Sequence, residues 1–116
     1  MALDSSSFYW TDSTANLAGA GSVNGAARPN GGAAGGEGSR YNSFIAEAFS
    51  DQVGTLYVDK SVDGGTTWRQ VASIASVANT SVSLKVPVSA PLYRSRFVNG
   101  ATPQTAFLLT SAYSMA

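Results

Sequence analysis

The sequence predicts an all-β fold, an antiparallel sandwich or barrel. From residue 41 to the end, about six segments alternate apolar and polar residues with the two-residue period of strands. Turn-forming residues separate them at intervals of about 8–12 positions, which is typical of such folds. Among these turns, Asp63-Gly64 and Asn99-Gly100 tolerate the positive φ that tight connections need. No stretch shows sustained helical periodicity.

Six segments are predicted as strands: 43–49, 54–61, 68–75, 81–88, 92–99 and 104–113. Alternation is clearest in 81–88. Its Pro87 has no N–H to donate, which predicts a sheet edge or a bulge. The last segment is apolar on both faces, which predicts a central strand or one that a partner covers.

The first 40 residues are predicted as a separate region, so that the chain divides into 1–40 and 41–116. Glycine and alanine dominate residues 18–39. Because glycine loses more backbone entropy on ordering than other residues, this region is either a flexible linker or an extended arm that orders against a neighbour. The preceding Phe8-Tyr9-Trp10 is either an aromatic anchor for a partner or a part of its own domain.

The composition favours a protein that associates with partners other than nucleic acid or membrane. Charged residues make up 12% of the chain and the formal net charge is zero, so little repulsion keeps copies apart. No net positive field attracts phosphates. No apolar run approaches the roughly 18 residues of a membrane helix, and the N-terminus lacks a signal-peptide pattern. The protein is therefore expected to be made and used in the cytoplasm, or to be assembled there into something larger.

The sequence offers little for catalysis. It has no histidine and no cysteine, which removes the commonest general base and the commonest metal ligand. The acids of the β-rich region, Glu47, Asp51, Asp59 and Asp63, lack the spacing of a carboxylate pair or a calcium loop. We therefore expect no enzyme activity, no cofactor and no metal.

Arg94 and Arg96 lie two positions apart, so they share one face of a predicted strand. This face is either solvated or salt-bridged, or it forms a row of polar contacts to an acidic partner. Trp68, Tyr57 and Tyr93 are candidates for stacking on sugars, although the phase of Trp68 favours a core position.

Two segments resemble small β-sandwich proteins of tailed bacteriophages. The first, Phe49–Trp68, contains Ser-Asp-Gln-Val-Gly-Thr-Leu-Tyr-Val and Val-Asp-Gly, and the second, Pro91–Gly100, contains Tyr-Arg-Ser-Arg-Phe-Val-Asn-Gly. The resemblance implies a jelly-roll-like capsid decoration, or cement, protein. Such virion components lie as homo-oligomers on the outer surface of the phage head, where they bind the major capsid protein and bridge neighbouring capsomers.

On this interpretation the protein self-associates as a dimer or trimer, and its N-terminal arm reaches onto the major capsid protein or a neighbouring copy. The expected contact residues are Phe8, Tyr9, Trp10, Arg28, Arg40, Arg94 and Arg96. The alternative is a tail, baseplate or spike accessory module that binds host glycan, because related sandwiches also occur in tail and spike proteins.

Overall fold

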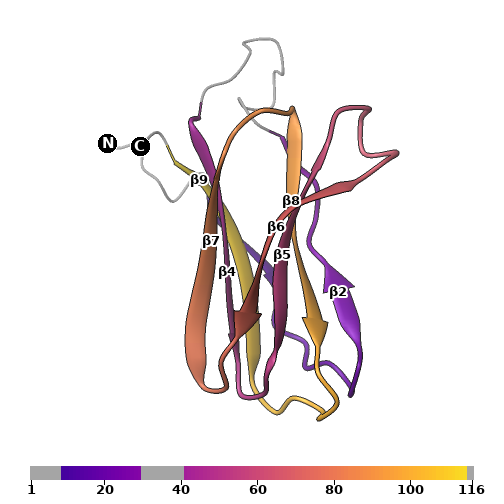
Figure 1. Ribbon diagram of the computed structural model, residues 1–116, viewed down its shortest axis with the longest axis vertical. Coiled ribbons are helices and arrows are strands. Elements are labelled where there is room, and N and C mark those ends of the chain that lie inside the picture. Colours follow the sequence, from indigo (N-terminus) through magenta and orange to yellow (C-terminus); the bar gives the residue numbers. More distant parts are fainter. Residues whose placement is uncertain (1–8, 30–40, 115–116) are drawn as a thin grey trace.

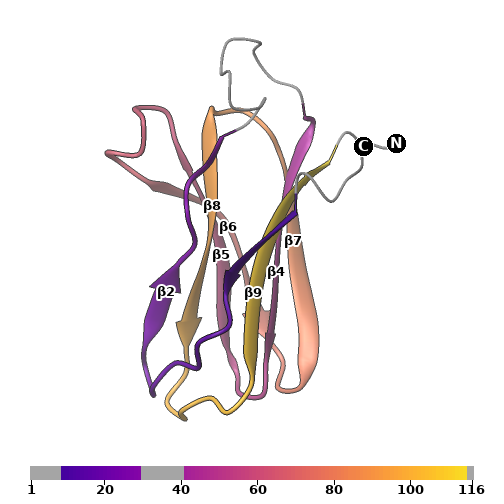
Figure 2. The ribbon, with the colours of Figure 1, turned by 180° about the vertical axis from the view of Figure 1, so that it is seen from behind.

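The fold is a sandwich of two antiparallel β-sheets (Figures 1 and 2). The structure is a computed structural model that describes residues 9–29 and 41–114. Within these residues every regular element is a strand, so the predicted all-β sandwich is confirmed. The described part of the chain contains no helix of the length and apolarity needed to cross a membrane.

Each sheet takes strands from both ends of the chain. The first contains β1 (Tyr9–Ser13), β4 (Ser43–Ser50), β7 (Thr80–Pro87) and β9 (Phe107–Ser114). The second contains β2 (Ser22–Asn24), β3 (Arg28–Pro29), β5 (Gly54–Ser61), β6 (Arg69–Ser76) and β8 (Leu92–Asn99). The strand order is β1-β9-β4-β7 in the first sheet and β2-β8-β5-β6 in the second, where β3 also pairs with β8.

The strand pairing is nested along the chain. β1 pairs with β9, β2 and β3 pair with β8, β4 pairs with β7, and β5 pairs with β6. A jelly roll has this arrangement, in which a ribbon of paired strands is wound into two sheets. The β5–β6 connection is the predicted hairpin, and Gly64 and Gly65 in it have φ of 77° and 95°. The predicted jelly-roll-like architecture is therefore confirmed.

The core lies between the sheets and is rich in aromatic rings. Phe44 of β4 and Tyr93 of β8 stack across the sandwich with their centroids 5.3 Å apart. Phe97 of β8 and Phe107 of β9 form a second contact across it at 5.1 Å. Aromatic pairs of this kind contribute beyond the apolar area that they bury.

Two positional predictions about individual strands are also confirmed. β9 lies between β1 and β4, which agrees with a central strand that is apolar on both faces. β7 ends its sheet, so Pro87 lies at the sheet edge that its missing N–H predicts.

Residues 9–29, which the sequence places in a separate N-terminal region, form strands of both sheets. The small residues here permit close packing, because a Cβ on Gly25 would lie 2.6 Å from the Ser95 hydroxyl. The Gly25 N–H also donates to the Ser95 carbonyl at 2.7 Å. Within the predicted arm, Ser22–Asn24 and Arg28–Pro29 pair with β8 of their own domain, and Tyr9–Ser13 pairs with β9, which agrees with the alternative that the aromatic segment is a part of its own domain. The rest of the predicted arm, 30–40, lies outside the described residues.

Candidate partner-binding surface

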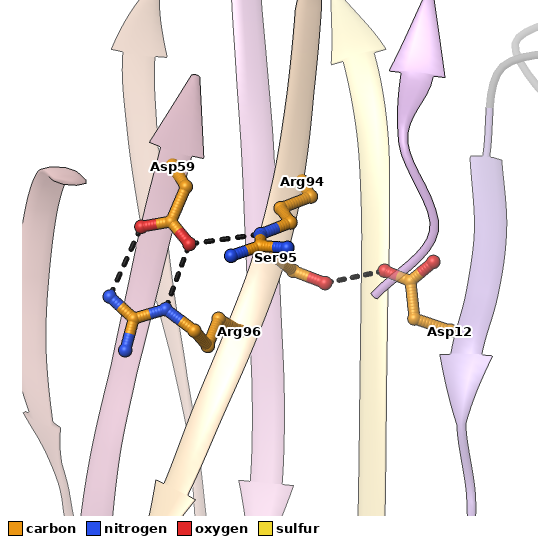
Figure 3. A network of polar contacts seen from close by, with 5 residues as sticks. All are labelled: Asp12, Asp59, Arg94, Ser95 and Arg96. Atoms are coloured by element: carbon orange, nitrogen blue, oxygen red, sulfur yellow. Dashed lines mark hydrogen bonds and ion pairs between the residues drawn. The ribbon is translucent and has the colours of Figure 1, made fainter. Parts of the chain in front are cut away.

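The outer face of the second sheet carries a charged cluster centred on Asp59. Asp59 lies in β5 opposite Arg94 of β8. Its carboxylate accepts a hydrogen bond from Arg94 Nε at 3.0 Å, and bonds from Arg96 Nε and Nη2 at 2.8 and 3.1 Å (Figure 3). Two guanidinium groups therefore cover one carboxylate, and Asp59 is buried although it faces away from the core.

An aromatic ring flanks each of these arginines. Arg94 Cζ lies 4.4 Å from the centroid of the Trp68 ring, and Arg96 Cζ lies 4.0 Å from that of Tyr57. We call the five residues Trp68, Arg94, Asp59, Arg96 and Tyr57 the arginine–aromatic ladder. Cation–π stacking and the bonds to Asp59 hold the guanidinium planes in place, so the surface is organised before a partner binds.

The ladder has a net positive charge, because two guanidinium groups share one carboxylate. Hydrogen bonding to Asp59 is the main cause that raises the pKa of Arg96 above its ordinary value. A guanidinium has five N–H donors, and Arg94 gives one and Arg96 two to Asp59. Further donors are thus left for an acidic or carbonyl-rich surface. Tryptophan, tyrosine and arginine are also the residue types most enriched at interface hot spots.

Two aromatic residues lie elsewhere than the sequence suggests. Trp68 precedes β6 and stacks on Arg94 outside the core cluster, so a core position for it is wrong. The register between β5 and β6 shifts between Val58 and Asp59, which breaks the alternation that would carry Trp68 inward. Tyr93 lies fully buried in the core and is not accessible for stacking on a sugar.

The sequence did not identify Asp59 as a site residue. Asp59 and Tyr57 share one face of their strand, as Arg94 and Arg96 do on theirs, but only the pairing of β5 with β8 brings the four together. Charge complementarity between alternating strand faces is the signal that points to such a pairing.

Trp10 and Arg28, both predicted as partner contacts, contact their own domain. Arg28 forms an ion pair with the fully buried carboxylate of Asp12, and its Cζ lies 4.7 Å from the centroid of the Trp10 ring. Trp10 meets Tyr113 edge-on with the centroids 6.0 Å apart. Burial raises the pKa of Tyr113 well above its ordinary value. Its hydroxyl donates to the Arg28 carbonyl at 2.6 Å.

Of the other predicted contacts, Tyr9 is exposed, whereas Phe8 and Arg40 lie outside the described residues. Tyr9 borders a shallow pocket on the outer face of the first sheet. The other residues that line this pocket are Glu47, Phe49, Ser81, Leu108 and Thr110. Tyr9 therefore lies on the opposite sheet from Arg94 and Arg96, so the structure does not bring all the predicted contacts onto one surface.

Two further acidic residues of the sandwich fix the conformation of loops by accepting hydrogen bonds. Asp51 accepts hydrogen bonds from the Thr105 hydroxyl and N–H, and the hydroxyl bond is the main cause that lowers the pKa of Asp51 far below its ordinary value. Asp63 accepts bonds from the Thr67 N–H and the Ser61 hydroxyl, and these lower its pKa too. In residues 9–29 and 41–114 no group of three or more metal-binding side chains comes together. The absence of enzyme activity stays a prediction.

Comparison with known proteins gives a family and a fold. The family model described as "Uncharacterised protein YqxG N-terminal domain" matches residues 2–114. The crystal structure of PBSX exported protein XepA superposes with a TM-score of 0.82 at 21% identity, covering 100% of this chain and 40% of that chain. The crystal structure of PirA superposes with a TM-score of 0.55 at 14% identity, covering 90% of each chain.

At these identities both structures are similar in fold alone. The chain spans less than half the length of XepA. No curated protein is significantly similar to it in sequence.

Proposed function

The chain belongs to the family of the uncharacterised protein YqxG N-terminal domain, and from this premise we propose that it is a phage structural protein that binds a protein partner on the virion. The arginine–aromatic ladder carries the proposal. Its side chains are fixed by contacts within the sheet, yet Arg94 and Arg96 keep N–H donors beyond those bound to Asp59. A surface of this kind serves adhesion and needs no catalytic group.

Two observations support the association with phage. XepA, whose jelly roll this chain shares, is an exported protein of phage PBSX. In addition, the two segments that resemble tailed-phage sandwich proteins, Phe49–Trp68 and Pro91–Gly100, contain all five residues of the ladder. The resemblance and the candidate surface therefore rest on the same part of the chain.

Specifically, we propose that the protein decorates the phage capsid. The ladder docks on the major capsid protein at the outer surface of the head, and copies of the protein bridge neighbouring capsomers. The low charge content of the chain limits repulsion between neighbouring copies. Contacts that are weak for one copy add up on a symmetric lattice that binds many copies at once. Synthesis takes place in the host cytoplasm, before assembly.

A second candidate is a tail or spike accessory module that binds host glycan. The rings of Trp68 and Tyr57 favour it, because both lie at the outer face of the second sheet, where a sugar can stack on an aromatic ring. The description of XepA as exported also fits a role away from the head.

The test uses phage particles produced without this protein, mixed with the purified chain and sedimented. We expect the wild type to sediment with heads at high copy number, and Arg94→Gln to bind about tenfold more weakly or worse, which corresponds to about 1.4 kcal/mol. Arg69→Gln is the matched control, because it removes the same charge from an exposed position in β6 outside the ladder.

Three outcomes separate the candidates. Wild-type protein that does not sediment with particles contradicts a virion role. Equal binding by the wild type and Arg94→Gln contradicts the ladder as the surface. Binding to tails or to a glycan array, with none to heads, replaces decoration by the second candidate.

A further inference from the structure

Sheet edges invite pairing with other chains unless they are short, charged, irregular or interrupted by proline. Three of the edges in the described residues have such protection. β1 is five residues long and its register with β9 is irregular. β2 and β3 have three and two residues, and β3 contains Pro29. β7 carries Lys85 and ends at Pro87.

β6 lacks most of these protections. It has eight residues, Arg69–Ser76, of which only the first is charged, and it contains neither proline nor glycine. It pairs with β5 at one side and ends its sheet (Figure 1). Because antiparallel strands bond through alternate residues, the backbone N–H and C=O groups of the other residues face away from β5. The shifted register near Val58 leaves Ala72–Ser76 as a regular run.

The same edge exposes apolar side chains. Val71 is 40% exposed and Ile74 is 37% exposed, and Val77, directly after β6, is 58% exposed. Ile74 lies within the regular run of β6, and Val71 and Val77 lie just before and just after that run. Between Gln70 and Ala78 the chain has no charged residue at all. β6 therefore combines an open backbone with an apolar and uncharged surface.

The geometry points to a second copy of this chain as the occupant of the β6 edge. An antiparallel β6–β6 pair centred on Ile74 places Ile74 opposite Ile74 of the second copy. The same register places Ala72 opposite Ser76 of the second copy and, by symmetry, Ser76 opposite Ala72, so that the regular run pairs with itself. One twofold register thus pairs the uncharged run Ala72–Ser76 with itself around the exposed Ile74, with Val71 and Val77 at the ends of the pair, and an isologous dimer requires such self-complementarity.

Charge also favours a second copy over a different partner. In this register the paired run Ala72–Ser76 contains no charged residue, and Arg69 lies beyond it, so the two Arg69 side chains do not oppose each other. The net charge of zero adds no long-range repulsion between copies. A strand from another protein could also form hydrogen bonds with the open backbone of β6. Nothing in β6 selects the side chains of such a strand, whereas the symmetric pairing matches β6 to itself.

The dimer would join the two second sheets into one continuous sheet. The twofold axis of an antiparallel pair stands perpendicular to the sheet, so both arginine–aromatic ladders would face the same side. A dimer would then present two ladders to one surface, and binding by the second would be intramolecular. The inferred self-association does not depend on the binding of the ladders to a partner, because it rests on β6 alone.

Sedimentation equilibrium of the full chain from micromolar to millimolar concentration tests the inference. We expect the wild type to form dimers and Ile74→Lys to associate at least a hundredfold more weakly, because the substitution places two ammonium groups opposite each other. Val62→Lys is the matched control, because Val62 is 69% exposed in the β5–β6 connection and lies outside the edge. It should dimerise as the wild type does. Circular dichroism verifies that each variant is folded.

Cross-linking gives an independent readout, since the chain has no cysteine. Residues directly opposite in an antiparallel pair have Cα atoms about 4.5–5.5 Å apart, which suits a disulfide. Ile74→Cys should form a covalent dimer under mild oxidation, and Lys85→Cys on the β7 edge should not. Any one of three results overturns the inference: a monomeric wild type, unimpaired dimers of Ile74→Lys, or equal cross-linking at both edges. A dimer that fails to bind particles supports this inference and contradicts the proposed function.

Discussion

Asp12 accepts a hydrogen bond of 2.6 Å from the Ser95 hydroxyl, although 83 positions separate the two residues in the chain (Figure 3). Asp12 belongs to β1 of the first sheet and Ser95 to β8 of the second. Arg28 of β3 completes the contact as the ion-pair partner of Asp12. The N-terminal segment is therefore attached to both sheets through one buried carboxylate.

Removal of that carboxylate is expected to destabilise the sandwich. Asp12→Ala should lower the free energy of unfolding by about 3 kcal/mol, because it leaves the largely buried guanidinium of Arg28 without its counter-charge. Urea denaturation measures the change. Thr11→Ala, at an exposed position in the same strand, is the control and should change stability by about 0.5 kcal/mol or less. A loss below about 1 kcal/mol for Asp12→Ala would contradict a structural role for the contact.

Asp51 is expected to make stability depend on acid pH. Its folded pKa lies below the ordinary value of 3.8 because the carboxylate accepts bonds from Thr105. A group with a lowered folded pKa stabilises the protein above its unfolded pKa, and that stability is lost as pH falls toward the folded value. Unfolding free energies from urea curves at about pH 5 and about pH 3 should therefore differ less for Asp51→Asn than for the wild type.

Asp63 contributes in the same direction, because its pKa is lowered too, so some acid dependence should remain in the Asp51→Asn variant. Thr105→Val is the partial control, since it removes the hydroxyl that bonds Asp51 and keeps the carboxylate. It should give an intermediate acid dependence. If Asp51→Asn kept the full difference between the two pH values, the assignment to Asp51 would be wrong.

Two glycines should respond differently to alanine. A Cβ on Gly25 would lie 2.6 Å from the Ser95 hydroxyl, so Gly25→Ala should cost about 1–3 kcal/mol through steric overlap. Gly64 has open space around it but a φ of 77°, so Gly64→Ala should cost about 1 kcal/mol through backbone strain alone. The midpoints of urea denaturation curves show which of the two variants loses more stability. A larger loss for Gly64→Ala would contradict this explanation of Gly25.

Several features of the fold could be predicted from alternation and turn chemistry. The run 81–88 has one apolar face, and its partly buried Val82 and Leu84 do pack against the core. The hairpin predicted at Asp63-Gly64 forms, with positive φ at Gly64 and Gly65, because tolerance of positive φ is a local property of the residue type. Asn99-Gly100 was predicted as a turn by the same reasoning. Asn99-Gly100 does not close a hairpin. It begins the connection from β8 in the second sheet to β9 in the first sheet, where β9 pairs with β1 and β4.

From residue 41 on, the sequence by itself determined which segments form strands and which faces of most strands are apolar, because both depend on neighbours a few positions away. Only the tertiary structure decided which strands lie side by side. The nested pairing brings Arg94 and Arg96 to Asp59 and brings residues 9–29 into both sheets. Pairings of this kind depend on register between distant segments, and a shift of one residue would turn each of these side chains to the other face.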